Sequence, residues 1–158
     1  MPDLLVPLYK LPRVDVSFPE LRRAGVTIRR ANPWELSPLR DFATRHFNVR
    51  WADEASAGFA NKPISVFIAV ENQEIVGFSA YECTRRNFFG PTGVSEAMRG
   101  RGIGRALLLA ALEGLREMGY AYCIIGGAGP VEFYRQVCGA IEIADSVPGI
   151  YTDMLKKE

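Results

Sequence analysis

The sequence is poor in the residues that build metal sites and disulfide frameworks. It contains 3 cysteines and 1 histidine among 158 residues. Because the cysteines are odd in number and far apart, we expect neither disulfides nor a zinc site. Cys83, Cys123 and Cys138 are instead predicted to be small core residues. No metal is therefore expected.

The sequence also lacks an excess of either charge and any long apolar run. Its 19 basic and 18 acidic residues leave a net charge of +1, which gives no whole-molecule attraction to nucleic acid or to an anionic membrane. No apolar run approaches the roughly 18 to 20 residues of a membrane span, and the start of the chain does not resemble a signal peptide. We therefore expect a cytoplasmic protein with no nucleic-acid partner and no membrane partner.

What is present is typical of one globular domain. The length of 158 residues and the hydrophobic content of 48% are sufficient for a buried core. Residues 1–24 carry 4 prolines and no regular apolar pattern, which predicts an N-terminal extended arm packed on the domain. The domain itself is expected to span residues 25–158.

The order of predicted elements indicates a mixed sheet flanked by helices. Strand-like runs occur at residues 25–31, 64–72, 74–85, 88–98 and 120–129, and a final pair of strands is predicted at 140–145 and 149–155. Helical patterns occupy about residues 33–46, 51–61, 102–118 and 130–138. The run 120–129 is apolar throughout, as expected of a central strand buried on both faces. A strand, a helix and a strand in succession over residues 88–126 require a parallel crossover, so the fold class is α/β or α+β.

The stretch from Glu96 to Ala110, EAMRGRGIGRALLLA, places glycines and arginines where a helix begins. Glycine costs a helix about 1 kcal/mol relative to alanine, and an arginine in the first turn meets the positive end of the helix dipole. Both choices oppose helix stability. They are explained if the main-chain N–H groups of residues 100–104 surround an anion and Arg101 and Arg105 add charge. The expected anion is a phosphate.

Two familiar phosphate-binding motifs do not fit this stretch. In the dinucleotide pattern G-x-G-x-x-G the third glycine position holds Arg105 or Leu107, and no lysine follows as a P-loop requires. The pattern that is present is Arg99-x-x-Gly102-x-Gly104. A nucleotide or nucleic-acid binder that uses the arginines stays an alternative, and it predicts salt-sensitive binding to polyphosphate or RNA.

This pattern resembles R/Q-x-x-G-x-G/A, the motif of the GNAT superfamily of acyl-CoA-dependent N-acetyltransferases. The context is similar too: FFGPTGVSEAMRGRGIGRALL resembles the fourth strand and its helix, YAYCIIGG the fifth strand, and GPVEFYRQVCGA the Phe-Tyr-x-x-x-Gly region. The resemblance covers roughly residues 25–155. It implies a mixed, mostly antiparallel twisted sheet whose fourth and fifth strands, residues 88–98 and 120–129, are parallel and splayed, flanked by about four helices.

The resemblance also implies a function and a binding site. The protein would transfer an acetyl group from acetyl-CoA, its co-substrate, directly to a primary amine of an unidentified small-molecule acceptor. Main-chain groups of residues 92–94 would pair with the pantetheine arm, an amide near Val94 would stabilise the developing oxyanion, and the amides of residues 100–105 would hold the pyrophosphate. The implied cofactor-binding residues are Thr92, Gly93, Val94, Arg99, Gly100, Arg101, Gly102, Ile103, Gly104 and Arg105.

The catalytic residues follow from the same resemblance. Tyr134 matches the tyrosine that protonates the departing thiolate in the family, and Glu82 and Glu96 are the candidates for the general base. The chain departs from the family at Gly127, where an asparagine is usual, and FYRQVCGA has one more residue between tyrosine and glycine. A catalytically inactive acyl-CoA-binding module is therefore an alternative. His46 is interpreted as a cation at the end of a helix or as a base.

The acceptor stays open at this point. Pocket residues in the family come partly from the two early helices, which makes aromatic residues the candidates for the acceptor pocket: Trp34, Phe47, Trp51, Phe59 and Tyr151. Small amines, amino acids, antibiotics, and protein lysines or N-termini are all compatible with the sequence. An acidic pocket would indicate a polyamine or an aminoglycoside, and a basic pocket an amino-acid carboxylate. The resemblance is also compatible with a homodimer.

Overall fold

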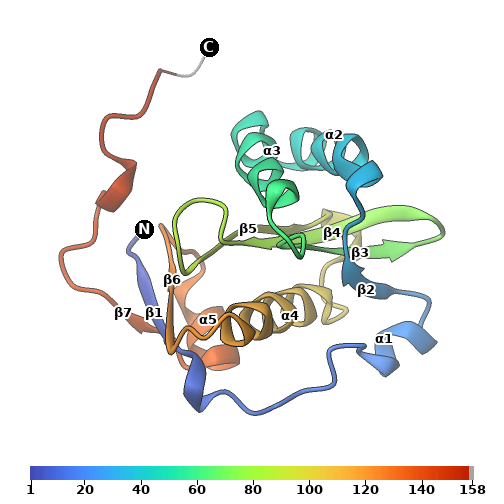
Figure 1. Ribbon diagram of the computed structural model, residues 1–158, viewed down its shortest axis with the longest axis horizontal. Helices are drawn as coiled ribbons and strands as arrows, with labels where there is room; N and C mark the ends of the chain where they lie inside the picture. Colours follow the sequence, from blue (N-terminus) through green and yellow to red (C-terminus); the bar gives the residue numbers. More distant parts are fainter. Residues whose placement is uncertain (157–158) are drawn as a thin grey trace.

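The computed structural model describes residues 1–156 and places a seven-stranded sheet between two layers of helices (Figure 1). The strands are β1 (Leu4–Pro7), β2 (Thr27–Arg30), β3 (Val66–Glu71), β4 (Glu74–Tyr81), β5 (Phe88–Val94), β6 (Tyr122–Ile125) and β7 (Ile141–Glu142), in the order β2-β3-β4-β5-β6-β1-β7. The α-helices are α1 (Pro19–Arg23), α2 (Leu36–His46), α3 (Val49–Ser56), α4 (Ile103–Glu117) and α5 (Val131–Cys138). Helices α2 and α3 lie on one face of the sheet, and α4 and α5 on the other (Figure 1). The mixed, mostly antiparallel sheet that was predicted is confirmed.

The hairpin of β3 and β4 shows why these residues form strands. Alternate side chains along β3 enter opposite faces, with Phe67 in the core under α4 and Ile68 in the core under α2 and α3. Asn72 and Gln73 form the turn, and both have positive φ, at 51° and 64°. A two-residue turn with two positive φ angles has the backbone twist that antiparallel strands require.

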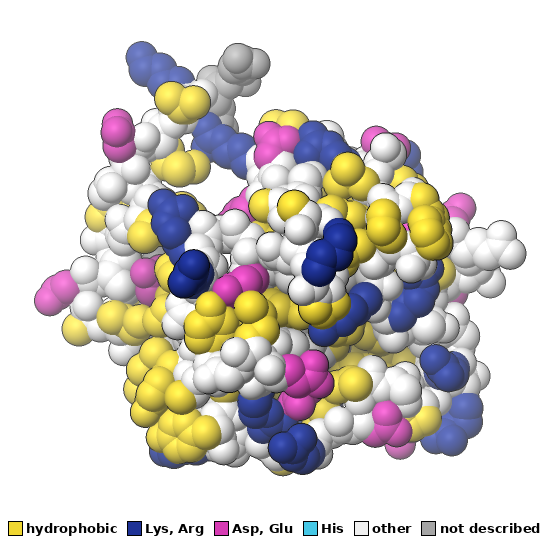
Figure 2. Space-filling view, in the orientation of Figure 1, with side chains coloured by type: hydrophobic (Ala, Val, Ile, Leu, Met, Phe, Trp, Pro, Cys, Tyr) yellow, Lys and Arg dark blue, Asp and Glu magenta, His cyan; other side chains and the backbone are white. Residues whose placement is uncertain are grey.

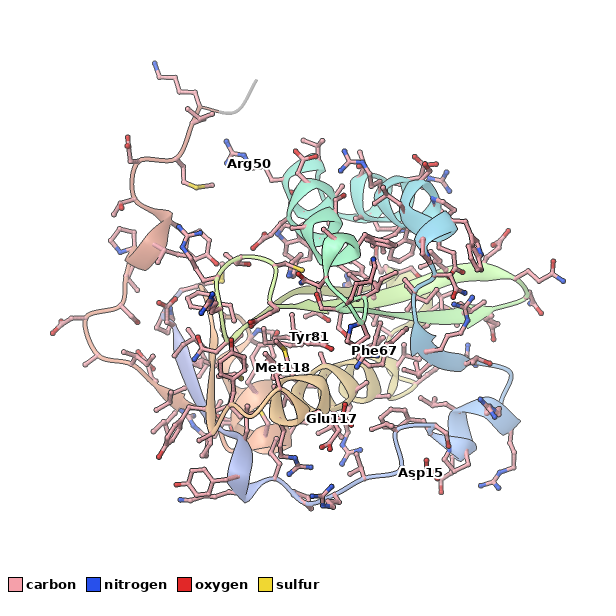
Figure 3. The ribbon with its side chains drawn as sticks, viewed as in Figure 1. Asp15, Arg50, Phe67, Tyr81, Glu117 and Met118 are labelled. Atoms are coloured by element: carbon pink, nitrogen blue, oxygen red, sulfur yellow. The ribbon has the colours of Figure 1, made fainter. Side chains whose placement is uncertain are left out.

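Helix α4 contributes most of one core. Leu107, Leu112 and Leu115 are fully or almost fully buried, and burying one such side chain stabilises the fold by about 1.5–3 kcal/mol. Tyr81 and Phe67 lie between the sheet and α4 (Figure 3). The Tyr81 ring also explains the glycine at position 114 of α4, because a Cβ on Gly114 would lie 2.5 Å from that ring.

Strand β6 is central in the sheet but is not buried on both faces, which corrects the prediction. Cys123 and Ile125 are buried against the α4 side, whereas Tyr122 is 44% exposed and Ile124 is partly buried. The reason is that α2 and α3 pack on β4 and β5 and leave the same face of β6 without a helix. That face is partly covered by the C-terminal segment, whose Tyr151 contacts Gly126.

The predicted arm of residues 1–24 contributes an internal strand to the sheet. Strand β1 pairs antiparallel with β6 on one side and with β7 on the other. Leu4 and Val6 are fully buried on the α4 side. The boundary at residue 24, between arm and domain, stays a prediction.

Of the predicted final pair of strands, the first is confirmed over two residues and the second is wrong. Only Ile141–Glu142 pairs with the sheet, while Gly149–Tyr151 forms a 3-10 turn and the segment beyond it runs away from the sheet (Figure 1). Strand β1 occupies the edge of β6 at which a C-terminal strand would pair. Pro148, which lacks an N–H, and Gly149, with φ at 63°, also interrupt an extended segment.

The cysteines form no disulfide within residues 1–156. Cys123 and Cys138 are buried and Cys83 is partly buried, and all three thiols are free. Within residues 1–156, no helix has the length and apolar character needed to cross a membrane.

Candidate functional site

Strands β5 and β6 run parallel but pair at one end only. Phe88 pairs with Ile124 and Phe89 with Ile125, and the strands diverge beyond these positions. On its other side, β5 continues to pair with β4 as far as Val94. Gly90 has φ at 118° and Pro91 has no N–H to offer. The predicted splay is therefore confirmed, and residues 90–94 have no strand partner on the edge that faces β6.

The loop of residues 99–105 follows directly and ends in helix α4. Gly100 and Gly102 have φ at 82° and 80°, a left-handed conformation that glycine adopts without steric cost. Gly102 is the N-cap of α4 and makes no side-chain cap, and the first main-chain bond of the helix joins Ala106 N to Gly102 O at 3.1 Å. The N–H groups of residues 103–105 thus have no acceptor inside the helix. Such a turn of free amides binds anions.

The three arginines of this loop have different surroundings. Arg99 Nε donates to Val94 O at 3.2 Å, which ties the loop to the end of β5. Arg101 is paired with Glu71, at 3.2 Å. Arg105 has no hydrogen bond or ion pair within residues 1–156 and lines a groove of about 530 Å³ beside the residue 14–24 segment. Within residues 1–156, Arg99 and Arg105 therefore have no carboxylate partner, and their charges are free to meet a ligand.

The residues just before the loop are covered on the side of α2 and α3. A Cβ on Gly93 would lie 2.2 Å from Cζ of Phe47, so the close approach that this glycine permits is the approach of Phe47. Thr92 Oγ1 donates to Phe78 O at 3.0 Å and is thereby turned toward β4. Any contact of residues 92–94 with a cofactor would have to use main-chain groups, as the sequence interpretation assumed.

Tyr134 lies on α5 next to the paired end of β5 and β6. It is 6% exposed, and its ring packs edge-on against Phe89, with centroids 6.3 Å apart. Burial, and then the neighbouring Cys138, raise the pKa of Tyr134 to about 12, so the phenol keeps its proton at neutral pH. Its hydroxyl has no hydrogen bond in the described chain, where every fully enclosed side-chain oxygen has a partner. This oxygen is consequently not completely enclosed.

The two glutamates predicted as bases lie elsewhere. Glu82 accepts from Tyr120 Oη and from Asn87 N, both at 2.6 Å, and lines a separate cavity of about 440 Å³. Glu96 is exposed in the turn Glu96–Met98. His46 is exposed at the end of α2 and packs on Phe42 with ring centroids 4.5 Å apart. The roles assigned to these residues and to Tyr134 stay predictions.

A cavity of about 390 Å³ opens where β5 and β6 diverge. We call it the Glu54 cavity. The residues around it that matter here are Trp51, Glu54, Thr84, Pro91, Gly126 and Tyr151. They come from α3, the β4–β5 loop, β5, the end of β6 and the C-terminal segment. That segment stands away from the body of the molecule and leaves an opening at the upper left of Figure 2.

Glu54 provides the acidic group of this cavity, and the sequence analysis missed it. Thr84 Oγ1 donates to Glu54 Oε1, which orients the carboxylate. Burial, followed by the charges of Glu54 and Asp3, raises the pKa of Tyr151, and the charge of Arg85 opposes this shift. A signal was available, because Glu54 is three residues after Trp51 on a helix and must share its face.

The aromatic candidates are divided between this cavity and other places. Trp51 and Tyr151 line it, and Phe47 stacks on Trp51 with ring centroids 4.9 Å apart. Phe59 packs against the core under α2 and α3. Trp34 is 78% exposed on the surface. With Phe89 of β5, three aromatic residues therefore line the cavity, and Phe47 supports Trp51 from behind.

Just under half of the chain matches a known protein family. Residues 62–137 match the family model of the acetyltransferase (GNAT) domain. This range contains the 99–105 loop, the divergence of β5 and β6, and Tyr134. No curated protein matches the chain in sequence.

Solved structures of similar fold cover more of the chain. A GCN5-related glucosamine N-acetyltransferase region of a fungal multi-domain beta-N-acetylglucosaminidase superposes with a TM-score of 0.71 at 18% identity, over 90% of this chain and 19% of that one. A GCN5-related N-acetyltransferase from Sphaerobacter thermophilus gives 0.69 at 21% identity, over 90% and 48%. The present chain therefore spans about a fifth and about half of these two proteins.

A third structure was solved with a ligand. A GNAT family acetyltransferase from Brucella melitensis in complex with acetyl-CoA gives a TM-score of 0.55 at 25% identity, over 70% of this chain and 80% of that one.

Proposed function

We propose that the protein transfers the acetyl group of acetyl-CoA directly to a primary amine of a small-molecule acceptor, because residues 62–137 match the family model of the acetyltransferase (GNAT) domain. The observation that carries the proposal is that three structural features follow one another along the chain. A strand with an unpaired edge (residues 90–94) is followed by a loop with left-handed glycines and then by a helix with an uncapped N-terminus.

These residues fit acetyl-CoA in charge and shape. The free amides of residues 103–105 and the unpaired guanidinium of Arg105 suit a pyrophosphate. The unpaired edge of residues 90–94 offers main-chain groups to the amides of a pantetheine arm. When bound, acetyl-CoA supplies an activated thioester carbonyl.

The chain's own residues would then donate a proton to the leaving group and bind the acceptor. The acceptor ammonium group must first lose a proton to solvent. Its nitrogen then attacks the carbonyl, the new C–N bond forms as the C–S bond breaks, the nitrogen gives a second proton to solvent, and the sulfur takes up a proton. Tyr134 is the proposed donor of that last proton and would regain one from solvent, since its raised pKa keeps the phenol protonated and its hydroxyl is not completely enclosed. The Glu54 cavity, at the divergence of β5 and β6, is the proposed place of the acceptor.

An inactive acyl-CoA-binding module is the alternative. It rests on Gly127, which replaces the usual asparagine and whose N–H is bound by Asp3 Oδ1 at 2.8 Å. The two functions separate when the protein is mixed with acetyl-CoA and a panel of amines: the enzyme releases free thiol with at least one amine, whereas the module binds acetyl-CoA and releases none.

A matched pair of variants at Gly104 tests the binding loop. A Cβ there would lie 3.7 Å from the Val94 side chain, an ordinary contact, and this glycine is not left-handed. We expect Gly104→Ala to bind acetyl-CoA within about threefold of the parent protein, and Gly104→Val, whose extra methyl groups cover the amides, to lose binding.

Calorimetric titration measures this binding, and thermal unfolding checks the fold. Gly102→Val should also lose binding, together with some stability, because φ of Gly102 is 80°. Normal binding by a folded Gly104→Val protein would refute the proposed loop.

A further inference from the structure

We propose that the acceptor is a small monoamine with an apolar body, whose ammonium group is held by Glu54 and whose body lies against Trp51 and Tyr151. The inference rests on the proposed function, because it takes the Glu54 cavity as the acceptor site. It selects one chemical class from the amines, amino acids, amino sugars and protein groups that the sequence leaves open.

The position of the cavity connects it to the predicted cofactor site. Gly90 and Pro91 of β5 and Gly126 and Gly127 after β6 line it, and these are the positions directly beyond the last paired residues of the two strands. The other large cavities named above, near Glu82 and beside Arg105, do not include these four residues. The Glu54 cavity is therefore the one that a group placed between the diverging strands would reach.

The charge of the cavity favours a single ammonium group. Glu54 Oε1 accepts from Thr84, while Oε2 has no hydrogen-bond partner within residues 1–156 and is free to accept from an amine. No lysine or arginine is among the described residues that line the cavity. Arg85 is exposed and donates to Thr84 O instead, at 2.8 Å. An amino-acid carboxylate would thus be repelled by Glu54, and Arg85, the arginine whose charge acts on Tyr151, lies outside the lining of the cavity.

The walls favour an apolar body. Trp51 stacks on Phe47 and is held in place by it, and the Tyr151 hydroxyl lies 2.7 Å from where a Cβ on Gly126 would be. Val147 and Pro148 add apolar surface from the C-terminal segment. An aromatic wall attracts an ammonium ion as well as a hydrocarbon. The hydroxyl groups of an amino sugar would find few partners here, which costs binding free energy.

The volume of the cavity also suits a small acceptor. Its volume of about 390 Å³ is at the low end of small-molecule sites, about 300–1,000 Å³. One ring with a short aminoalkyl chain fits this volume. Glu54 is also the one acidic side chain among the described lining residues, and a polyamine would leave its other ammonium groups without a partner.

The outer wall is the C-terminal segment, which hydrogen bonds to Asp3 and to Arg50 of α3 hold in place. Ser146 Oγ accepts from Asp3 N at 2.8 Å. Arg50 extends from α3 toward the C-terminal segment (Figure 3) and donates to Leu155 O at 2.5 Å. These contacts keep Tyr151 opposite Trp51 and Glu54, so that the three side chains face a common space.

Fluorescence of Trp51 measures occupancy of the cavity without requiring turnover. The chain has 2 tryptophans, and Trp34 is exposed and outside the cavity, so Trp34→Phe leaves Trp51 as the single reporter. This protein is titrated with amines in the presence and absence of CoA. We expect saturable changes with 2-phenylethylamine and cyclohexylamine, and at least about 10-fold weaker responses with L-phenylalanine, glucosamine and spermidine.

A matched pair of acidic residues tests the role of Glu54. Glu54→Gln should weaken 2-phenylethylamine binding about 10-fold and raise its KM without changing the affinity for acetyl-CoA, and Glu54→Asp should restore part of the binding. Asp53→Asn is the control, because Asp53 is exposed, paired with Arg40 and outside the cavity. It makes the same change of charge one residue away and should bind the amine normally.

The possible failures are distinguishable. If acetyl-CoA does not bind, the proposed function is wrong. If acetyl-CoA binds but glucosamine, spermidine or L-phenylalanine matches or exceeds the apolar monoamines, or if Glu54→Gln binds 2-phenylethylamine like the parent, the inference about the acceptor is wrong and the acetyltransferase proposal stands.

Discussion

The 99–105 loop and the Glu54 cavity lie near the same pair of strands but are built in different ways. The loop is seven consecutive residues, and it presents main-chain N–H groups and the guanidinium groups of Arg99 and Arg105, which have no ion pair within residues 1–156. The cavity is assembled from α3, the β4–β5 loop, the ends of two strands and the C-terminal segment, and it presents side chains. A phosphate needs only donors and charge, which a short glycine-rich turn supplies, whereas an organic acceptor needs a surface of matching shape.

This difference predicts that the two halves of the site respond independently to substitution. Loop variants should change the affinity for acetyl-CoA and leave amine preference alone. Cavity variants should do the reverse. Tyr134, which lies beside the divergence of the strands, should affect the rate and neither affinity.

The largest effect is expected at Tyr134. We predict that Tyr134→Phe lowers kcat about 100-fold or more, because a general acid is lost, while acetyl-CoA affinity and the Trp51 fluorescence response stay unchanged. Steady-state kinetics with 2-phenylethylamine measure the change. Tyr120→Phe is the control, since its hydroxyl bonds Glu82 and its loss should cost only about 1 kcal/mol of stability.

The pH profile adds a second readout for the same residue. The pKa of Tyr134 is raised to about 12, so the phenol holds its proton until the pH approaches that value. Any alkaline fall of kcat below about pH 11 must then belong to another group, and it should persist in whatever activity Tyr134→Phe retains. If the fall disappeared in that variant, the phenol would be titrating far lower than its burial allows.

A smaller effect is expected in the loop, where we predict a larger loss of acetyl-CoA affinity at Arg105 than at Arg101. Arg105→Gln should weaken acetyl-CoA binding about 10-fold, because a charge-assisted hydrogen bond contributes about 1.5–3 kcal/mol. Arg101→Gln should weaken it by less than about threefold, since Arg101 is already paired with Glu71. Calorimetric titration at two salt concentrations checks both values. Equal losses would mean that the Arg101–Glu71 pair opens when acetyl-CoA binds.

The smallest effect is expected at Thr84 in the cavity. Thr84→Val removes the hydrogen bond that orients Glu54 and should raise the KM for the amine about threefold at unchanged kcat. Thr84→Ser keeps the hydroxyl and should behave like the parent. An unchanged KM in Thr84→Val would show that the carboxylate does not depend on Thr84 for its position.

Local patterns in the sequence were sufficient for the elements on which the proposed cofactor site rests. The helical pattern over residues 102–118 predicted α4, and the strand-like runs at 64–72 and 74–85 predicted β3 and β4. The glycines and arginines of the 99–105 loop predicted the anion-binding turn. These features depend on backbone conformation over a few residues, so the residues that determine them are neighbours in the chain.

What only the tertiary structure decided depends on contacts between distant segments. β1 joins the sheet beside β6, which leaves the C-terminal segment without a strand partner and lets it close the Glu54 cavity instead. Glu54, Thr84 and Tyr151 meet across 97 positions of sequence, and α2 and α3 leave one face of β6 uncovered. The sequence determined a place for a phosphate because main-chain amides are local. The choice of acceptor is set by side chains that only the folded chain brings together.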